Sequence, residues 1–240
     1  MSMVKALFQK KALTQVIAEY LGIDRSYDND ACCVTQEALT TPTTKEVIYT
    51  KDTTQITYVK NMLTDAESEF LTKAASGCHR STVVENASRS KTNNARTSST
   101  CAVVSKNNRV MSCIKQKLSH VAESDKKNME PLQVTRYVDG QQYKPHYDYF
   151  TTGHKKGDRQ RVTTLFTYLE SPGDNCGGET VFPVCDNLQV KPKKGDAVLW
   201  RNLLENGNVD TNTLHAGLPV TCKNVEKIGL NVWFGDQPFS

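Results

Sequence analysis

The chain has 240 residues, of which 38% are hydrophobic and 23% are charged, which is the composition of an ordinary soluble globular protein. The net charge of +4 is modest and the charges are interspersed, whereas a nucleic-acid binder usually gathers its basic residues on one face. No stretch approaches the roughly 20 apolar residues of a membrane span, and the N-terminus lacks the apolar core of a secretory signal. We therefore expect no nucleic-acid partner, no membrane partner and an intracellular location, unless a leader has been removed.

The N-terminal part is expected to be an extension of a larger domain. Apolar side chains recur at near-helical spacing over residues 4–21, and Gly22 follows as a stop signal, which predicts a helix that packs on the domain. Residues 24–46 are polar and indicate a linker or loop. We divide the chain into an N-terminal helix and linker over 1–45 and one domain over 46–240.

The first part of this domain combines strands with a helix. The stretches around 47–49 and 56–59 are rich in β-branched and aromatic residues, which favour strands. Thr64 has Glu67 three residues later, and this capping box predicts a helix that ends at Gly77.

A polar stretch separates this helix from a second one. Residues 86–100 are rich in Ser, Asn, Thr and Arg, which predicts a mobile surface loop that closes over a substrate. Asn107 or Asn108 caps the second helix. Its apolar stripe comprises Val110, Ile114, Leu118 and Val121.

The character of the chain changes at Pro131. Short strand patterns follow, separated by clusters of Gly, Pro, Asn and Asp, and Asp139-Gly140 is a turn signal between two of them. Helices followed by many short strands predict an α+β protein. We expect a double-stranded β-helix (jelly roll) core with helices packed outside and an N-terminal helical extension.

The eight cysteines give no metal-binding pattern, because no two of them are spaced as Cys-x-x-Cys. An even number permits disulfides, but a chain of this size does not need them for stability. We expect mostly free thiols.

His146, Asp148 and His215 form the candidate metal site. Side chains two apart on a strand point to the same side, so His146 and Asp148 share a face. His215 comes from a distant strand pattern and completes two imidazoles and one carboxylate. This facial triad leaves coordination positions open and is typical of non-haem Fe(II) oxygenases.

The last strand pattern, KIGLNVWF over residues 227–234, alternates with period two. Its apolar face consists of Ile228, Leu230, Val232 and Phe234. Its other face carries Lys227 near one end and Trp233 near the other. Lys227 is either an exposed residue at a strand end or the partner of a co-substrate carboxylate beside the metal.

Together with the metal triad, five segments carry a resemblance to a known family. In chain order they read RTSS from 96, RYVDGQQYKPHYD from 136, RVTTLFTYL from 161, GGETVFP from 177 and VKPKKGDA from 190. The chain resembles the prolyl 4-hydroxylases of the Fe(II)/2-oxoglutarate-dependent dioxygenases, in the stand-alone form of viruses and microbes. The similarity covers residues 56–236 and implies the jelly-roll fold.

The resemblance implies a site for 2-oxoglutarate. Lys227 matches the basic residue that binds the far carboxylate, although it follows His215 at two residues more than the family's usual spacing, which leaves Lys223 as the rival. Tyr137, Tyr168 and Thr180 match positions beside the co-substrate.

The resemblance also implies a peptide site and a reaction. Tyr143, Arg161 and Trp233 match residues around the target proline, while Gly235 stands where the family often has a histidine. The reaction hydroxylates peptidyl proline at C4 in proline-rich or collagen-like peptides, consumes O2, converts 2-oxoglutarate to succinate and CO2, and depends on ascorbate.

Two other functions remain open. One is a 2-oxoglutarate-dependent hydroxylase of another side chain or of a nucleobase. The other is a non-catalytic jelly-roll binding module, since such scaffolds host many functions.

Overall fold

The computed structural model describes residues 42–86, 89–91, 94–103, 109–151 and 158–239. Residues 43–240 form one compact unit, separate from residues 1–42. The helix predicted over 4–21 lies outside the described residues. The division of the chain at residue 45 therefore stays a prediction.

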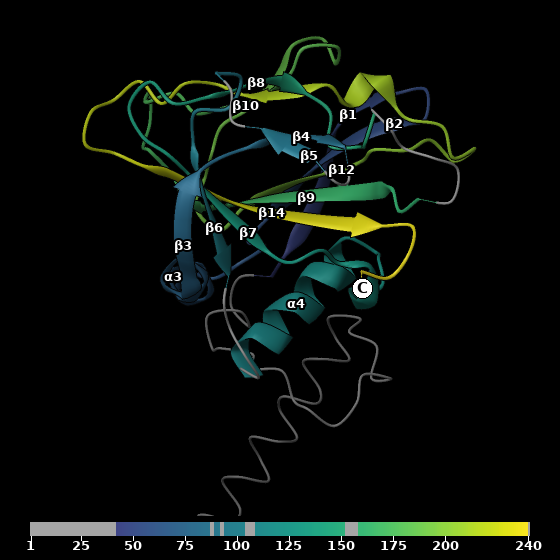
Figure 1. Cartoon of the computed structure of the whole chain (residues 1–240), viewed down its shortest axis with the longest axis horizontal. Helices are drawn as coiled ribbons and strands as arrows, with labels where there is room; N and C mark the ends of the chain where they lie inside the picture. The colour runs from purple at the N-terminus through teal and green to yellow at the C-terminus, as the bar shows by residue number, and fades with distance from the viewer. Residues whose placement is uncertain (1–41, 87–88, 92–93, 104–108, 152–157, 240) are drawn as a thin grey trace, which may run out of the picture. The chain divides into compact units, whose positions relative to one another are not determined.

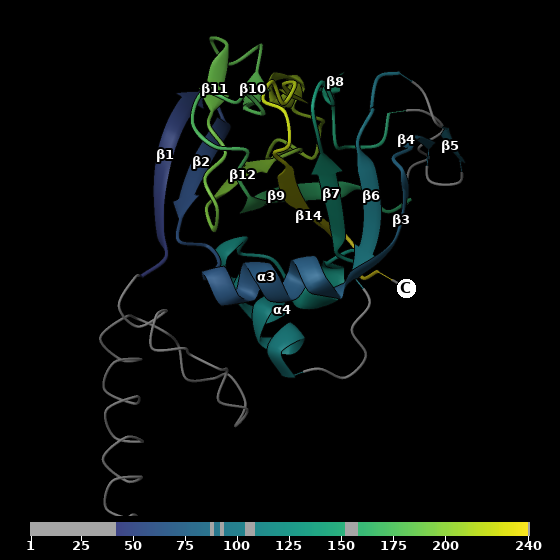
Figure 2. The ribbon, with the colours of Figure 1, turned by 90° about the vertical axis from the view of Figure 1, so that its left-hand side faces the viewer.

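Two antiparallel sheets face each other, as the jelly-roll prediction requires (Figures 1 and 2). In spatial order, the larger sheet contains β1 (Thr44–Lys51), β2 (Thr54–Lys60), β12 (Ala197–Arg201), β9 (Arg161–Glu170), β14 (Lys227–Gly235), β7 (Gln133–Tyr137), β6 (Ser99–Val103) and β3 (Ala75–Arg80). The smaller sheet contains β11 (Leu188–Val190), β10 (Thr180–Phe182), β13 (His215–Gly217) and β8 (Tyr143–His146). The predicted fold class is confirmed.

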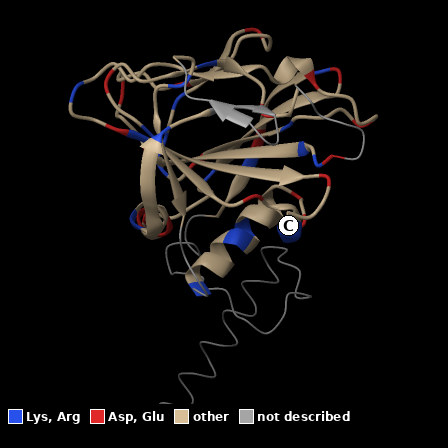
Figure 3. Ribbon diagram, in the orientation of Figure 1, with Lys and Arg blue, Asp and Glu red and all other residues tan. Residues whose placement is uncertain are grey.

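Two helices cover the other face of the larger sheet, α3 (Asp65–Ala74) and α4 (Arg109–Val121) (Figure 2). Two short 3-10 helices, η1 (Lys126–Asn128) and η2 (Thr211–Thr213), lie in connections. No helix among the described residues is long and apolar enough to cross a membrane. Lys, Arg, Asp and Glu lie mainly on loops and helices, and the central strands β9 and β14 carry few of them (Figure 3).

The larger sheet separates two apolar cores. On the helix side, β9 and β14 contribute alternate residues that pack with α3 and α4: Leu165, Leu169, Ile228, Leu230, Val232 and Phe234. On the side of the smaller sheet, a second core contains Ile56, Phe166, Tyr168, Phe182, Val198 and Trp200. Both faces of the central strands are therefore buried. The interior between the two sheets is the space in which polar residues can form a site.

The capping box of α3 is confirmed, but its predicted end is wrong. The Thr64 hydroxyl accepts from the Glu67 amide and the Glu67 carboxylate accepts from the Thr64 amide. The helix ends at Ala74, and Gly77 lies inside β3 with a φ of 62°. A glycine with positive φ is also common at an irregularity in a strand, so the sequence pattern did not separate the two cases.

The apolar stripe of α4 is confirmed at Ile114, Leu118 and Val121, which are buried, whereas Val110 is only partly buried and Met111 is the fourth buried residue. Its proposed caps, at positions 107 and 108, lie outside the described residues.

The expected loop over 86–100 is wrong in part. The stretch includes β5 (Arg89–Lys91), which pairs with β4 (Val83–Asn86) in a two-stranded antiparallel sheet. Arg96 and Ser98 are buried, so this end of the stretch packs into the domain. Positions 87–88 and 92–93 lie outside the described residues, and closure over a substrate stays a prediction.

Asp139-Gly140 is a turn, as predicted, but the strands it joins do not pair with each other. The chain leaves β7 of the larger sheet at Tyr137 and enters β8 of the smaller sheet at Tyr143. This crossing carries the chain over the interior between the sheets.

The expectation of mostly free thiols is wrong for four of the cysteines. Cys78 is bonded to Cys101, and Cys176 is bonded to Cys222. The first bond joins the neighbouring strands β3 and β6. The second joins the segment after β9 to the turn before β14, two segments that only the fold brings together.

We predict that replacing both Cys176 and Cys222 by Ser lowers the free energy of unfolding by about 2–4 kcal/mol, because the bond closes a long loop of the unfolded chain. Urea unfolding of the oxidised protein measures this loss. Titration of thiols in denaturant, without reductant, provides the control: the variant should show as many thiols as the natural chain. Two fewer thiols in the variant would mean that the bond does not form.

Candidate functional site

His146, Asp148 and His215 come together between the two sheets. His146 ends β8 and His215 begins the neighbouring strand β13, where the two residues are directly opposite each other. Asp148 lies two residues beyond β8, with Oδ1 3.8 Å from Nε2 of His146 and Oδ2 3.7 Å from Nε2 of His215. The possible ligand atoms of the three residues all lie within 4.8 Å of one another, which is compact enough to surround one ion.

Backbone carbonyls orient both imidazole rings. Nδ1 of His146 donates to the carbonyl of Lys144 at 2.9 Å, and Nδ1 of His215 donates to the carbonyl of Thr213 at 3.0 Å. A proton on Nδ1 leaves the lone pair of Nε2 available to a metal.

The charges of the cluster suit a divalent cation. Burial, and then the nearby charge of His215, hold the pKa of His146 well below its ordinary value, so this ring is neutral. Burial acts to raise the pKa of Asp148, but the charges of His215, His146 and Arg161 outweigh it and lower this pKa to about 2. Two imidazoles with one carboxylate form the ligand set that Fe(II) takes in oxygenases with open positions.

Aromatic rings enclose the two histidines. The Tyr143 ring stacks on His146 with centroids 3.4 Å apart. On the other side, Trp200 lies 4.7 Å and Phe182 lies 5.8 Å from the His215 ring. These contacts restrict rotation of both imidazoles.

Lys227 lies on the inner face of β14 and is only 2% exposed. Its Nζ lies 5.3 Å from the ring centroids of Tyr137 and Phe166 and 5.6 Å from that of Tyr168. Burial lowers its pKa to about 7, although the charge of Glu179 acts to raise it, and within the described residues the amine has no hydrogen bond and no ion pair. A buried amine without a carboxylate is costly unless a ligand supplies one. Lys223, the rival, is exposed.

The other residues predicted beside the co-substrate surround the same amine. The Tyr168 hydroxyl donates to Oγ1 of Thr180 at 2.8 Å, which joins β9 to β10. A Cβ added to Gly178 would lie 3.2 Å from Cδ of Lys227, so this glycine leaves room for the lysine side chain.

Phe166 and Gly229 were missed by the sequence analysis. A Cβ at Gly229 would lie 2.3 Å from the Phe166 ring, so Gly229 makes the space that this ring occupies beside Lys227. The spacing could have revealed Phe166, because it is two residues from Tyr168 on the same strand and so shares its face.

Arg161 and Trp233, predicted around the peptide, pack on each other. The guanidinium carbon of Arg161 lies 3.6 Å from the Trp233 ring centroid and 4.9 Å from that of Phe150. Nε1 of Trp233 is buried beside the Asp148 carboxylate, whose pKa it helps to lower, although no hydrogen bond of strict geometry joins the two.

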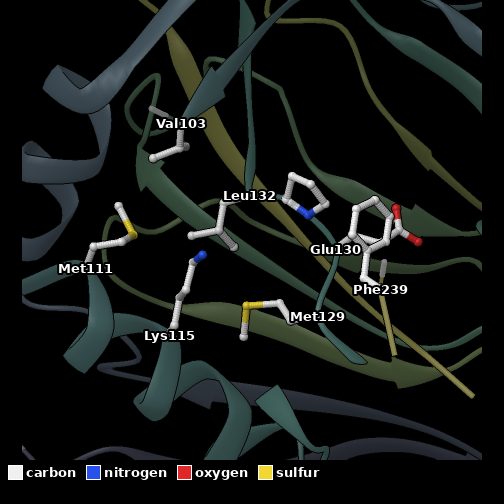
Figure 4. A pocket seen from close by; sticks show the side chains of 8 residues that line it. Val103, Met111, Lys115, Met129, Glu130, Leu132 and Phe239 are labelled. Carbon is white, nitrogen blue, oxygen red and sulfur yellow. The ribbon is translucent and has the colours of Figure 1, made fainter. Parts of the chain in front are cut away.

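Glu130 is a further residue that the sequence analysis missed. Its carboxylate accepts from Nε and Nη2 of Arg161 at 2.9 and 2.8 Å and from Nη1 of Arg159 at 2.7 Å. It also borders a cavity of about 220 Å³ between α4 and the sheet, in which Met111 and Met129 lie near the amine of Lys115 (Figure 4). None of the three metal-site residues lines this cavity.

We predict that Glu130→Gln lowers the free energy of unfolding by about 3 kcal/mol, because two mostly buried guanidinium groups lose their counter-charge. Burial alone would raise the pKa of Glu130, but the hydrogen bonds and charges of Arg161 and Arg159 lower it. The stabilisation is thus complete above the unfolded pKa of about 4.3 and is lost as pH falls through the lower folded value. Glu130→Gln should not show this loss of stability in acid.

Chemical unfolding at pH 7 and at pH 3 tests this prediction. Glu69→Gln is the matched control, because Glu69 pairs with Lys73 on the surface and such pairs contribute little. Equal losses in the two variants would contradict the assigned role of Glu130.

Comparison with known proteins places this geometry in a family. The 2OG-Fe(II) oxygenase superfamily model matches residues 132–235. Prolyl 4-hydroxylase 5 of Arabidopsis thaliana is 35% identical over 200 residues, which cover 75% of this chain and 67% of that protein. Probable prolyl 4-hydroxylase 6 of the same plant is 34% identical over 184 residues, which cover 67% of this chain and 62% of that protein.

A solved structure supports the same placement. The viral collagen prolyl hydroxylase vCPH of Paramecium Bursaria Chlorella virus-1, in complex with 2OG, superposes with a TM-score of 0.59 and 31% identity. The match covers 75% of this chain and 95% of that chain. The chain belongs to the prolyl 4-hydroxylases of the 2OG-Fe(II) oxygenase superfamily and is a 2-oxoglutarate-dependent dioxygenase.

Proposed function

We propose that the chain hydroxylates C4 of proline in proline-rich or collagen-like peptides and couples this to conversion of 2-oxoglutarate to succinate and CO2. The observation that carries the proposal is the His146, Asp148 and His215 cluster in the same interior as the unpaired amine of Lys227. A metal site beside a buried cation suits a co-substrate that is both a chelator and a dicarboxylate.

His146, Asp148 and His215 hold Fe(II) in this proposal. The two imidazoles offer neutral nitrogen and Asp148 offers the negative charge, which together leave a net positive charge for an anionic co-substrate. When bound, the iron supplies the activation of O2, and ascorbate keeps it reduced. The protein supplies binding, orientation and exclusion of water.

Lys227 binds the far carboxylate of 2-oxoglutarate, and Tyr137, Tyr168 and Thr180 line the space around it. A carboxylate restores the charge balance of the buried amine. The aromatic rings beside Nζ exclude water, which strengthens the ion pair. The exposure of Lys223 is the reason for preferring Lys227.

Tyr143, Arg161 and Trp233 bind the peptide around its target proline. A prolyl ring is apolar and packs well on aromatic faces. Arg161 uses Nε, Nη1 and Nη2 once each in protein hydrogen bonds, which leaves one N–H on each terminal nitrogen for a peptide carbonyl.

The proposal is tested by incubating the protein with Fe(II), 2-oxoglutarate, ascorbate and a proline-rich peptide. We expect release of succinate and the mass of one added oxygen on proline. His215→Ala should lose both products and its share of bound metal. Succinate without peptide oxidation, or oxidation of an oligonucleotide or of another side chain, would favour the other hydroxylase. No succinate at all would favour a binding module.

We predict that affinity for 2-oxoglutarate falls as pH rises above about 7, because Lys227 must be protonated to pair with the carboxylate and burial lowers its pKa to about 7. Below that pH the amine is already charged and the affinity should level off. Above it, the affinity should fall up to about tenfold per pH unit. Calorimetric titration from pH 6 to pH 9 measures the slope.

Lys227→Arg is the matched variant, since a guanidinium stays protonated across this range. Its affinity should be nearly independent of pH, even if its absolute value is lower. Both proteins carry the same metal ligands, so any titration of the metal site affects them equally. Parallel slopes in the two proteins would assign the pH dependence to a group other than Lys227.

A further inference from the structure

A chain of buried hydrogen bonds ends on the carboxylate of Asp148. Nε1 of Trp200 donates to Oδ1 of Asn202 at 2.9 Å, and Nδ2 of Asn202 donates to Oγ1 of Thr164 at 2.9 Å. Oγ1 of Thr164 then donates to Oδ2 of Asp148 at 2.8 Å. Trp200, Asn202 and Thr164 are at most 2% exposed, so water does not compete for these bonds.

The direction of this chain follows from the chemistry of its first member. An indole nitrogen can only donate, so Trp200 faces the carbonyl oxygen of the Asn202 amide and the NH2 group must face Thr164. A hydroxyl that accepts from an amide has its single proton left for another acceptor. Thr164 is thereby committed to donate to Asp148.

Strand register places the chain beneath the metal site. Thr164 on β9 lies directly opposite Trp200 on β12 and directly opposite Trp233 on β14. Cross-strand partners point to the same face of a sheet, and this face looks toward the smaller sheet. The Trp200 ring, which begins the chain, also packs against the His215 ring at 4.7 Å.

Asn202 is connected to His215 by a second route. The backbone carbonyl of Asn202 accepts from the backbone amide of Asp210 at 2.9 Å, and the backbone carbonyl of Asp210 accepts from the Thr213 hydroxyl at 2.7 Å. The carbonyl of Thr213 is the acceptor for Nδ1 of His215. Asn202 thus supports Asp148 through its side chain and His215 through its backbone.

We propose that Thr164 and Asn202 are positioning residues that hold Oδ2 of Asp148 in a hydrogen bond and so keep the carboxylate in one orientation for the metal. The inference rests on the proposed function, because it assigns Asp148 to the metal. Asp148 lies beyond the end of β8, so strand pairing does not fix its side chain. Without the hydroxyl, the carboxylate can rotate and the site loses preorganisation.

The test compares Mn(II) binding, without substrate or turnover, in Thr164→Val, Thr164→Ser and the natural chain. Outer-shell partners of metal ligands typically contribute about 10- to 100-fold to affinity, and we expect a loss of that size in Thr164→Val. Thr164→Ser keeps the hydroxyl and should restore binding. The Mn(II) electron paramagnetic resonance spectrum should change in Thr164→Val alone.

Thr167→Val is the matched control. Thr167 is on the same strand and fully buried, points to the helix side, and its hydroxyl has no hydrogen-bond partner in the described part of the chain. We expect it to bind Mn(II) like the natural chain. Equal affinity in Thr164→Val and Thr167→Val would overturn the proposal, whatever their thermal stabilities.

Asn202→Asp provides a second measurement if Thr164→Val fails to fold. An aspartate can still accept from Trp200 but cannot donate to Thr164, so the Thr164 proton turns toward it and away from Asp148. We expect weaker Mn(II) binding here, because the change withdraws the Thr164 proton from Asp148. Unchanged binding in Asn202→Asp would refute the proposal. Failure of the natural chain to bind Mn(II) would overturn the proposed function and this inference together.

Discussion

Period-two alternation on β9 and β14, with both faces buried, is the constraint on which the rest of the structure depends. Leu165 and Leu169 of β9 and the even positions of β14 pack on the helix side, while the residues between them face the smaller sheet. The first set forms an apolar core. The second set places Thr164, Tyr168, Lys227 and Trp233 in one interior. The same two strands therefore provide the stability of the domain and the floor of its site.

Buried polar groups in the interior between the sheets differ in how well they are paired. Among the described residues, the buried amine of Lys227 has no ion pair, although the charge of Glu179 acts on it. Arg161, by contrast, has both Glu130 and two aromatic rings as partners. A buried amine without an ion pair, within reach of a candidate metal site, is a place where an anionic ligand can complete the structure. The stability that these groups cost is supplied by the helix-side core.

Local and periodic signals predicted much of this architecture. Three features depend only on neighbours in the sequence and were predicted from it: the Thr64 capping box, the apolar stripe of α4 and the alternation of β14. The end of α3, the partners of Cys78 and Cys176 and the role of Glu130 depend on which strands become neighbours, which no local pattern contains. The metal triad was predicted from residue spacing and the residues around it from a resemblance, and the structure brings them into one interior, while their roles await the experiments proposed above.

Alternation on β14 also limits how the chain can change in length during evolution. Loss of one residue within the strand would exchange the faces of the residues on one side of the deletion, turning either the amine of Lys227 toward the apolar core or the Phe234 ring toward the smaller sheet. The turn before the strand, which contains Cys222, has no such restriction. Insertions and deletions are therefore tolerable at the margins of β14 and lethal within it, a pattern that sequences of related chains should display.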